Sequence, residues 1–163
     1  MARHLWKSPL NANDTTQNDD LGILREEVDR DIGTGYGTVK EYLYVQYYQG
    51  SAAIPASLGN ILCFVGTTPY MVTKDISDSN DSRVAGVAIG TLNHERFGWL
   101  QVGGICQSII TDGAVAVGNF ISPSATDGVA TTPAVASNTG RNFGVALDTD
   151  SGTVLGNAML FLA

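Results

Sequence analysis

Residues 38–50 read TVKEYLYVQYYQG, and this stretch decides the fold class. β-Branched and aromatic residues dominate it, as is typical of β-strands. Successive side chains of a strand point to opposite faces, so one face would carry mainly aliphatic groups and the other a row of tyrosines. The stretch therefore predicts a strand with an aromatic outer stripe formed by Tyr42, Tyr44 and Tyr48.

The segment that leads into this strand, DIGTGYGT at residues 31–38, looks at first like a phosphate-binding loop. A nucleotide-binding glycine loop needs a helix behind it, whose N-terminal amides and dipole face the phosphate. Here the loop leads into a strand, and no Gly-Lys-Ser/Thr motif accompanies it. We therefore interpret Gly33, Gly35 and Gly37 as a flexible hinge between an N-terminal arm and a β domain.

Short apolar runs continue at close intervals through the rest of the chain, separated by turn signals rich in Gly, Asp, Asn and Ser. The expected strands are residues 60–65, 70–74, 83–90, 97–102, 105–110, 114–117, 120–121, 144–147 and 155–162. Strands this short and frequent indicate a sandwich or a barrel, and 163 residues suit one domain. The sequence thus predicts an all-β, compact sandwich- or barrel-like domain over residues 39–163. An extended arm with its hinge would occupy residues 1–38.

Two segments of the β domain share a pattern. AGVAIGTLNHERFGWLQV (85–102) and FGVALDTDSGTVLGNAMLFL (143–162) each give Gly-Val-Ala-aliphatic, then a polar loop, then an apolar strand. We expect two similar hairpins, each with a glycine where its strand approaches another backbone closely.

The first 32 residues carry seven acidic and four basic side chains and few large apolar groups. Such a stretch cannot bury enough apolar surface to fold by itself. A short helix is one local possibility, with Asp19 or Asp20 as its N-cap and Leu21, Leu24 and Val28 on one face.

Apolar side chains on this polar arm are its candidate anchors. They are Trp6, Leu10, Leu21, Leu24 and Val28. We expect them to dock the arm on a neighbouring chain, and the alternative is that the arm folds back on its own domain.

The charge and the cysteines exclude several classes of protein. The net charge of −7 argues against nucleic acid as a partner, because an acidic surface repels phosphates. Cys63 and Cys106 each lie in an apolar run, which predicts two buried thiols. No apolar run approaches the roughly 20 residues of a membrane-spanning helix, and the first residues do not resemble a signal peptide. We expect a soluble protein, made in a reducing compartment, that has no membrane partner.

Side chains suited to catalysis or metal binding are sparse. His4 lies in the arm and His94 in a polar turn. Asp148 and Asp150 suit turns, where carboxylates cap their own backbone. The run DISDSND (75–81) leaves calcium open, but it lacks the glycine and terminal glutamate of an EF-hand loop. We expect no catalytic residue, no metal and no cofactor, and hence no enzyme.

Residues 84–163 resemble the small virion proteins of tailed bacteriophages, in particular capsid decoration (cement) proteins. The resemblance lies in the Gly-Val-Ala strand at 85–88, Gly-Trp-Leu-Gln-Val-Gly at 98–103, Gly-Asn-Phe at 118–120 and Gly-Val-Ala at 144–146. It implies a compact β domain of the β-tulip type, assembled as a homotrimer on the outer capsid surface after synthesis in the host cytoplasm.

The resemblance further implies a mechanical function. The arm would bridge neighbouring subunits of the major capsid protein through the five apolar side chains named above, and so stabilise the shell. One alternative is a head-fibre, tail or receptor-binding virion component, in which Tyr42, Tyr44 and Tyr48 would form a carbohydrate or receptor surface. A small β-fold hydrolase is the remaining alternative.

Overall fold

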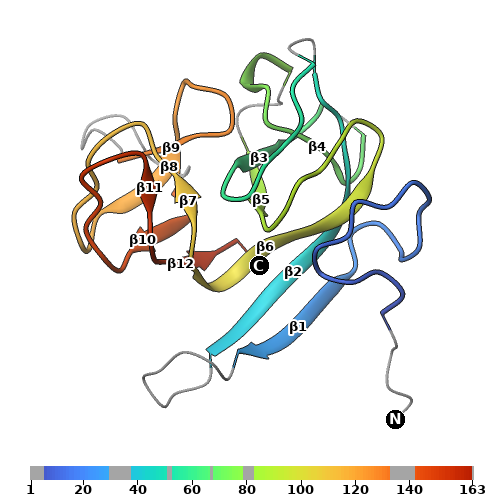
Figure 1. The fold of residues 1–163 in the computed structure, drawn as a ribbon, viewed down its shortest axis with the longest axis horizontal. Helices are drawn as coiled ribbons and strands as arrows, with labels where there is room; N and C mark the ends of the chain where they lie inside the picture. Colours follow the sequence, from blue (N-terminus) through green and yellow to red (C-terminus); the bar gives the residue numbers. More distant parts are fainter. Residues whose placement is uncertain are drawn as a thin grey trace.

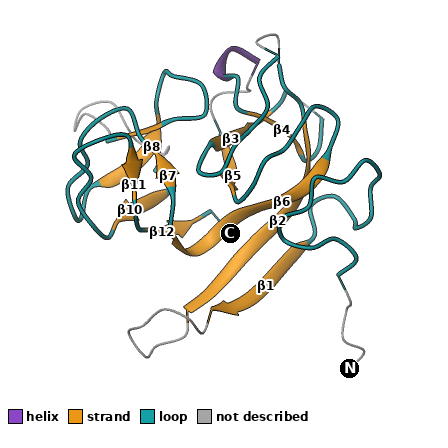
Figure 2. Ribbon diagram, viewed as in Figure 1, coloured by secondary structure: helices purple, strands orange, loops and turns teal. Residues whose placement is uncertain are grey.

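The computed structural model confirms the all-β prediction (Figure 2). It describes residues 6–29, 38–50, 53–66, 68–78, 83–132 and 142–162. Within these residues there are twelve β-strands and one 3-10 turn, η1 (Ile76–Asp78), and no α-helix.

The first half of the domain is a closed barrel of five strands. The strands are β2 (Thr38–Tyr47), β3 (Ile61–Phe64), β4 (Met71–Thr73), β5 (Val84–Ala88) and β6 (Phe97–Cys106). They pair in the order β2-β4-β3-β5-β6, and β6 pairs back with β2 to close the barrel. β2 and β4 are parallel and the other neighbours are antiparallel. Leu43, Val45 and Tyr47 of β2 point into the barrel core, as the strand alternation predicted.

The second half extends the sheet away from the barrel (Figure 1). The end of β6 pairs with β12 (Ala158–Phe161), which is followed by β10 (Gly144–Ala146), β8 (Phe120–Pro123) and β9 (Ala130–Thr131). We call these strands, with the end of β6, the side sheet. A separate two-stranded sheet of β7 (Ile109–Ile110) and β11 (Val154–Leu155) packs on it through a second hydrophobic core.

β6 changes partners at Gly103 and Gly104. Gly104 has a φ of +77°, and a Cβ there would lie 2.2 Å from the carbonyl oxygen of Val39, so glycine is required both for the bend and for the close approach. The side-chain amide of Gln101 donates to the carbonyl oxygens of Gly103 and Ile105, at 3.1 and 3.0 Å, and so spans the bend. β6 therefore belongs to the barrel before the bend and to the side sheet after it.

The two similar segments form two antiparallel pairs, as predicted. β5 pairs with β6, and β10 pairs with β12. A Cβ on Gly86 would lie 2.9 Å from the carbonyl oxygen of Gln101, and a Cβ on Gly144 would lie 2.8 Å from that of Met159. Each glycine thus permits a close backbone approach at the equivalent position.

Strand boundaries differ from the prediction in the second half of the chain. Residues 97–106 form one strand rather than two, because Gly103 and Gly104 bend β6 without breaking it. Residues 155–162 are divided between β11 and β12. Residues 114–117 form no strand, and Val115 makes only an isolated bridge with Asp150.

The helix considered for the arm is wrong. Leu24–Asp29 form β1, which pairs antiparallel with β2 from Leu24 opposite Leu43 to Asp29 opposite Thr38. The open edge of β2 supplies a ladder of hydrogen bonds to the same residues, and Gly22 disfavours a helix at this point. The β1–β2 ribbon extends beyond the body of the barrel (Figure 1).

Tyr42 and Tyr44 lie on the outer side of β2, as the sequence predicted, but both are buried. They belong to a hydrophobic cluster that includes side chains of residues 6–23. Tyr48 lies beyond the end of β2 and is half-buried.

Candidate functional site

The N-terminal strap, which we define as residues 6–23, lies across the outer face of β2 and β6. Its backbone bridges to β6 at Asp14 and Phe97, which exchange two hydrogen bonds of 2.9 and 3.0 Å. At its end, Gly22 and Ile23 bond to both backbone groups of Tyr44 and lead into β1. The strap is therefore fixed to the barrel at its middle and at its C-terminal end.

Aromatic rings form the centre of the contact between strap and barrel. Tyr44 of β2 and Trp99 of β6 lie side by side with ring centroids 5.0 Å apart, and the ring of Trp6 meets Trp99 edge to face at 5.5 Å. The guanidinium of Arg25 lies 5.6 Å from the ring centroid of Trp99 and 5.9 Å from that of Trp6. Tyr44 and Trp99 are fully buried, so the strap encloses a third hydrophobic cluster outside the barrel wall.

Ser8 is the polar centre of the strap. Its backbone N–H and that of Lys7 donate to the carboxylate of Asp19 at 2.9 and 3.2 Å. Its hydroxyl donates to the carboxylate of Asp14 and lies 3.2 Å from the hydroxyl of Tyr44.

The carbonyl oxygen of Ser8 is also used. It accepts hydrogen bonds from the indole N–H of Trp99 at 3.3 Å and from the guanidinium of Arg25 at 3.1 Å. Arg25 in turn forms an ion pair with Glu27 on β1. These bonds satisfy the groups that the strap buries, which explains how a polar segment packs on an aromatic surface.

The strap changes the acidity of the tyrosine beneath it. Burial raises the pKa of Tyr44 above its usual value of 10.0, and the nearby carboxylates of Asp14 and Asp19 add to this effect. The Tyr44 hydroxyl is therefore protonated at neutral pH and acts as a hydrogen-bonding group within the packing.

The five predicted anchors divide into two groups. Trp6, Leu10 and Leu21 pack into the cluster around Trp99. This part of the arm therefore folds back on its own domain, which was the alternative to docking on a neighbouring chain. Leu24 and Val28 on β1 are 51% and 60% exposed. Contact with a capsid remains a prediction for all five residues, and the last two are the most exposed of them. The hinge glycines Gly33, Gly35 and Gly37 lie outside the described residues, as does His4.

The turn residues considered for catalysis have structural roles. The imidazole of His94 accepts a hydrogen bond from the backbone N–H of Gln49 at 3.4 Å and packs against Tyr48 with centroids 5.4 Å apart. Asp148 accepts hydrogen bonds from the backbone and side chain of Asn157, and Asp150 accepts from the N–H of Gly152. The bond from Gly152 confirms the interpretation of Asp150 as a turn cap, whereas Asp148 bonds across to Asn157, nine residues further along the chain.

In the part of the chain that the structure describes, no three His, Cys, Asp or Glu side chains lie together in a way that could hold a metal ion. No helix in the described ranges is long and apolar enough to cross a membrane.

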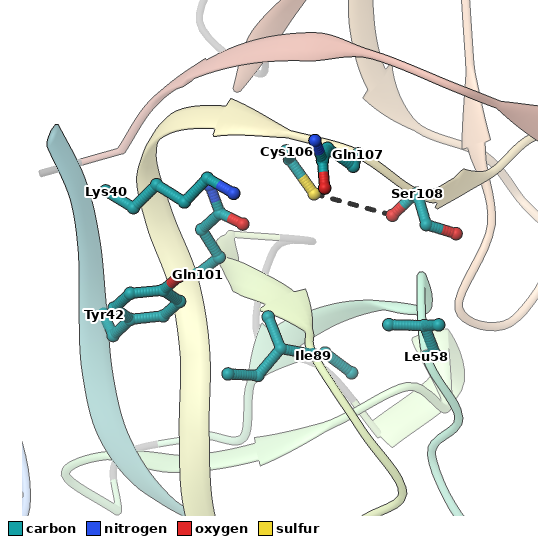
Figure 3. A pocket seen from close by; sticks show the side chains of 9 residues that line it. Lys40, Tyr42, Leu58, Ile89, Gln101, Cys106, Gln107 and Ser108 are labelled. Atoms are coloured by element: carbon teal, nitrogen blue, oxygen red, sulfur yellow. Dashed lines mark hydrogen bonds between the residues drawn. The ribbon is translucent and has the colours of Figure 1, made fainter. Parts of the chain in front are cut away.

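A hollow of about 330 Å³ lies between the barrel and the side sheet (Figure 3). Lys40, Tyr42, Gln101, Cys106 and Ser108 are among its lining residues. The thiol of Cys106 donates to the carbonyl oxygen of Ser108 at 3.5 Å, and burial raises its pKa, so it is a poor nucleophile. The amide of Gln101 is used in the β6 bend. The hollow is therefore explained by the junction of the two sheets.

Both cysteines are buried and neither is in a disulfide, as the sequence predicted. Cys63 lies on β3 of the barrel, and Cys106 ends β6.

A closed β-barrel with an attached side sheet defines the class of fold, and a solved structure shares it. No family model matches the chain, and no curated protein matches its sequence. One solved structure that shares this fold is the head fiber gp8.5 N base in bacteriophage phi29. It has a TM-score of 0.52 and 12% sequence identity, with 75% of this chain and 94% of that chain covered. This likeness establishes a shared fold.

Proposed function

We propose that the protein is a non-enzymatic structural component of a bacteriophage virion. It binds the outer surface of the capsid as an oligomer, takes the major capsid protein as its partner and stabilises the shell by clamping neighbouring subunits. The observation that carries the proposal is the fold likeness to a head-fibre base, which spans nearly all of that base. The sequence resemblance to decoration proteins supports the same kind of assembly.

The projecting β1–β2 ribbon is the surface we assign to capsid contact. β1 is an edge strand, and an edge strand can receive a further strand from a partner through main-chain hydrogen bonds. Leu24 and Val28 point to one side of it and are largely exposed. Burying the exposed half of each would contribute about 1 kcal/mol, and repetition over a closed lattice multiplies weak contacts.

A second candidate is the base of a head fibre, which the same solved structure favours. In that case the ribbon would anchor an appendage without clamping subunits. The tyrosine surface that a receptor-binding role would use is reduced, because Tyr42 and Tyr44 are buried and Tyr48 packs against His94.

Co-sedimentation with heads that lack the protein tests capsid binding. The Leu24→Glu, Val28→Glu double variant is expected to lose at least tenfold in affinity, because it places two carboxylates in the contact. Val154→Glu is the matched control, since Val154 is as exposed as Leu24 but lies on β11. Binding of the double variant at wild-type affinity would exclude the ribbon as the contact.

Mechanical stability of the heads then separates the two candidates. A clamp should raise the temperature at which decorated heads release DNA, whereas a fibre base should bind without raising it. Failure of the wild-type protein to bind any head would overturn both.

A further inference from the structure

The outer face of the side sheet carries an uninterrupted apolar row. Residues directly opposite each other in antiparallel strands share a face. The registers place Phe120 of β8 opposite Val145 of β10, Val145 opposite Met159 of β12, and Met159 opposite Ile105 of β6. Phe161 follows on the same face of β12. We call these five residues the apolar row.

The inner face of the same strands is already buried. Ile121, Ala146, Ala158, Leu160 and Cys106 alternate with the apolar row and belong to the second hydrophobic core. Antiparallel sheets that have one face in water normally show polar residues on that face.

β12 shows the departure from this rule most clearly. Its sequence, AMLF, alternates between buried and exposed positions but is apolar throughout. Phe120, Met159 and Phe161 are 52%, 38% and 48% exposed. The composition is that of strands buried on both faces, whereas the described residues bury only one.

We infer that the apolar row is buried against a second copy of this chain. Two half-exposed phenylalanines offer roughly 100 Å² each, and the remaining members with the adjacent Leu147 bring the apolar area to about 400–500 Å². A stable interface needs about 800 Å² per partner, of which the apolar part in homodimers is about two thirds. The exposed apolar area of the row is therefore close to the apolar area that each partner buries in a dimer.

Geometry and charge favour a second copy as the occupant. Two identical sheets have the same twist, so their faces stack about 10 Å apart with side chains interdigitated. A twofold axis sets the row against itself and gives a dimer, in place of the homotrimer that the resemblance implies. The chain carries a net charge of −7, and the row contains no ionisable side chain, so acidic copies can meet there with little repulsion. Glu41, which lies over Gly103 beside Phe161, falls at the polar border.

This inference deepens the proposed function by assigning the face through which its oligomer forms, and its test requires no capsid. Light scattering after size exclusion should give the wild type a mass of at least two chains at micromolar concentration. Met159→Glu should give one chain with an unchanged circular dichroism spectrum. Val154→Glu, which changes an exposed apolar position on β11 outside the row, should keep the wild-type mass.

Methionine oxidation gives a second measurement on the unmodified protein. Hydrogen peroxide should oxidise Met159 at least fivefold more slowly at high than at low protein concentration. Oxidation of Met71, which lies on β4 of the barrel, should not change and serves as the internal reference.

Three results would overturn the inference. They are a monomeric wild type at several hundred micromolar, an oligomer that Met159→Glu leaves intact, and a Met159 oxidation rate that does not depend on concentration. If the wild type is a monomer and Met159→Glu abolishes its binding to heads, the row is assigned to the capsid instead. If the protein is an oligomer but binds no heads, this inference stands and the proposed function is overturned.

Discussion

Tyr44 of β2 and Trp99 of β6 lie directly opposite each other, and their ring centroids are 5.0 Å apart on the outside of the barrel wall. Both side chains are fully buried even though the barrel core is on the other side of their strands. The cover is the N-terminal strap, so residues 6–23 belong to the hydrophobic packing of the domain. Deletion of residues 1–32 would expose this aromatic pair and remove β1, and we expect it to destabilise the domain.

Trp6→Ala should loosen the strap. The indole packs edge to face on Trp99, and its removal is expected to cost about 2 kcal/mol, below the value for a fully buried tryptophan because Trp6 is only part-buried. Urea unfolding measures the loss, and the fluorescence of Trp99 should shift to the red as water reaches it. An unchanged midpoint and emission maximum would show that the strap does not depend on this contact.

Asp19→Ala should destabilise the protein by about 2 kcal/mol, because one buried and one part-buried backbone N–H group lose a charged acceptor. Asp20→Ala is the matched control: the residue is adjacent and exposed, and the change should stay within about 0.5 kcal/mol. Denaturant midpoints for the two variants check the difference. Equal effects would mean that the carboxylate of Asp19 does not hold the start of the strap.

Alkaline pH should unfold the protein through its buried tyrosines. Burial raises the pKa of Tyr47 from 10.0 to about 12, so the folded state holds this proton more tightly than the unfolded state does. The resulting stability is complete below pH 10 and is lost as the pH rises from 10 to 12. The free energy of unfolding at several pH values, followed by urea titration, measures this decline.

Tyr47→Phe isolates the contribution of this residue to the decline. At pH 7 the variant should lose about 1 kcal/mol, because the hydroxyl donates to the carbonyl oxygen of Ile54 at 2.7 Å. Its stability should then fall less steeply than that of the wild type between pH 10 and 12. A parallel decline in the variant and the wild type would refute the assignment to Tyr47.

Gly104→Ala should cost at least about 3 kcal/mol or prevent folding, since the new Cβ would overlap the carbonyl oxygen of Val39 at a positive φ. Gly113→Ala is the control, because no atom lies within 4 Å of a Cβ at that position. Soluble yield and thermal midpoint compare the two. A stable Gly104→Ala protein would show that β6 can bend without this conformation.

The all-β class and most strands could be predicted because they depend on local patterns. The alternation in residues 38–50 and the repeated Gly-Val-Ala pattern determine which residues form strands and which glycines approach a neighbour. Barrel closure could not be predicted in this way. It depends on the pairing of β2 with β6, whose residues are more than fifty positions apart in sequence.

The fate of the arm depended on tertiary contacts. Ser8, Asp19 and Arg25 look like ordinary polar residues in the sequence, and only the fold brings them onto Trp99 and the N-terminal backbone. For the same reason the tyrosines of β2 were expected to face solvent. The sequence offered one signal for the apolar row, which is that β12 is apolar on both of its faces. This signal points to a row across several strands only once the strand register is known.

The continuity of β6 has a mechanical consequence. One uninterrupted chain segment is hydrogen-bonded in the barrel along its first part and in the side sheet along its last part. Tension applied to either half is carried by covalent backbone into the other, with no linker to absorb it. The two halves should therefore melt in a single calorimetric transition and, under load, yield at one common force.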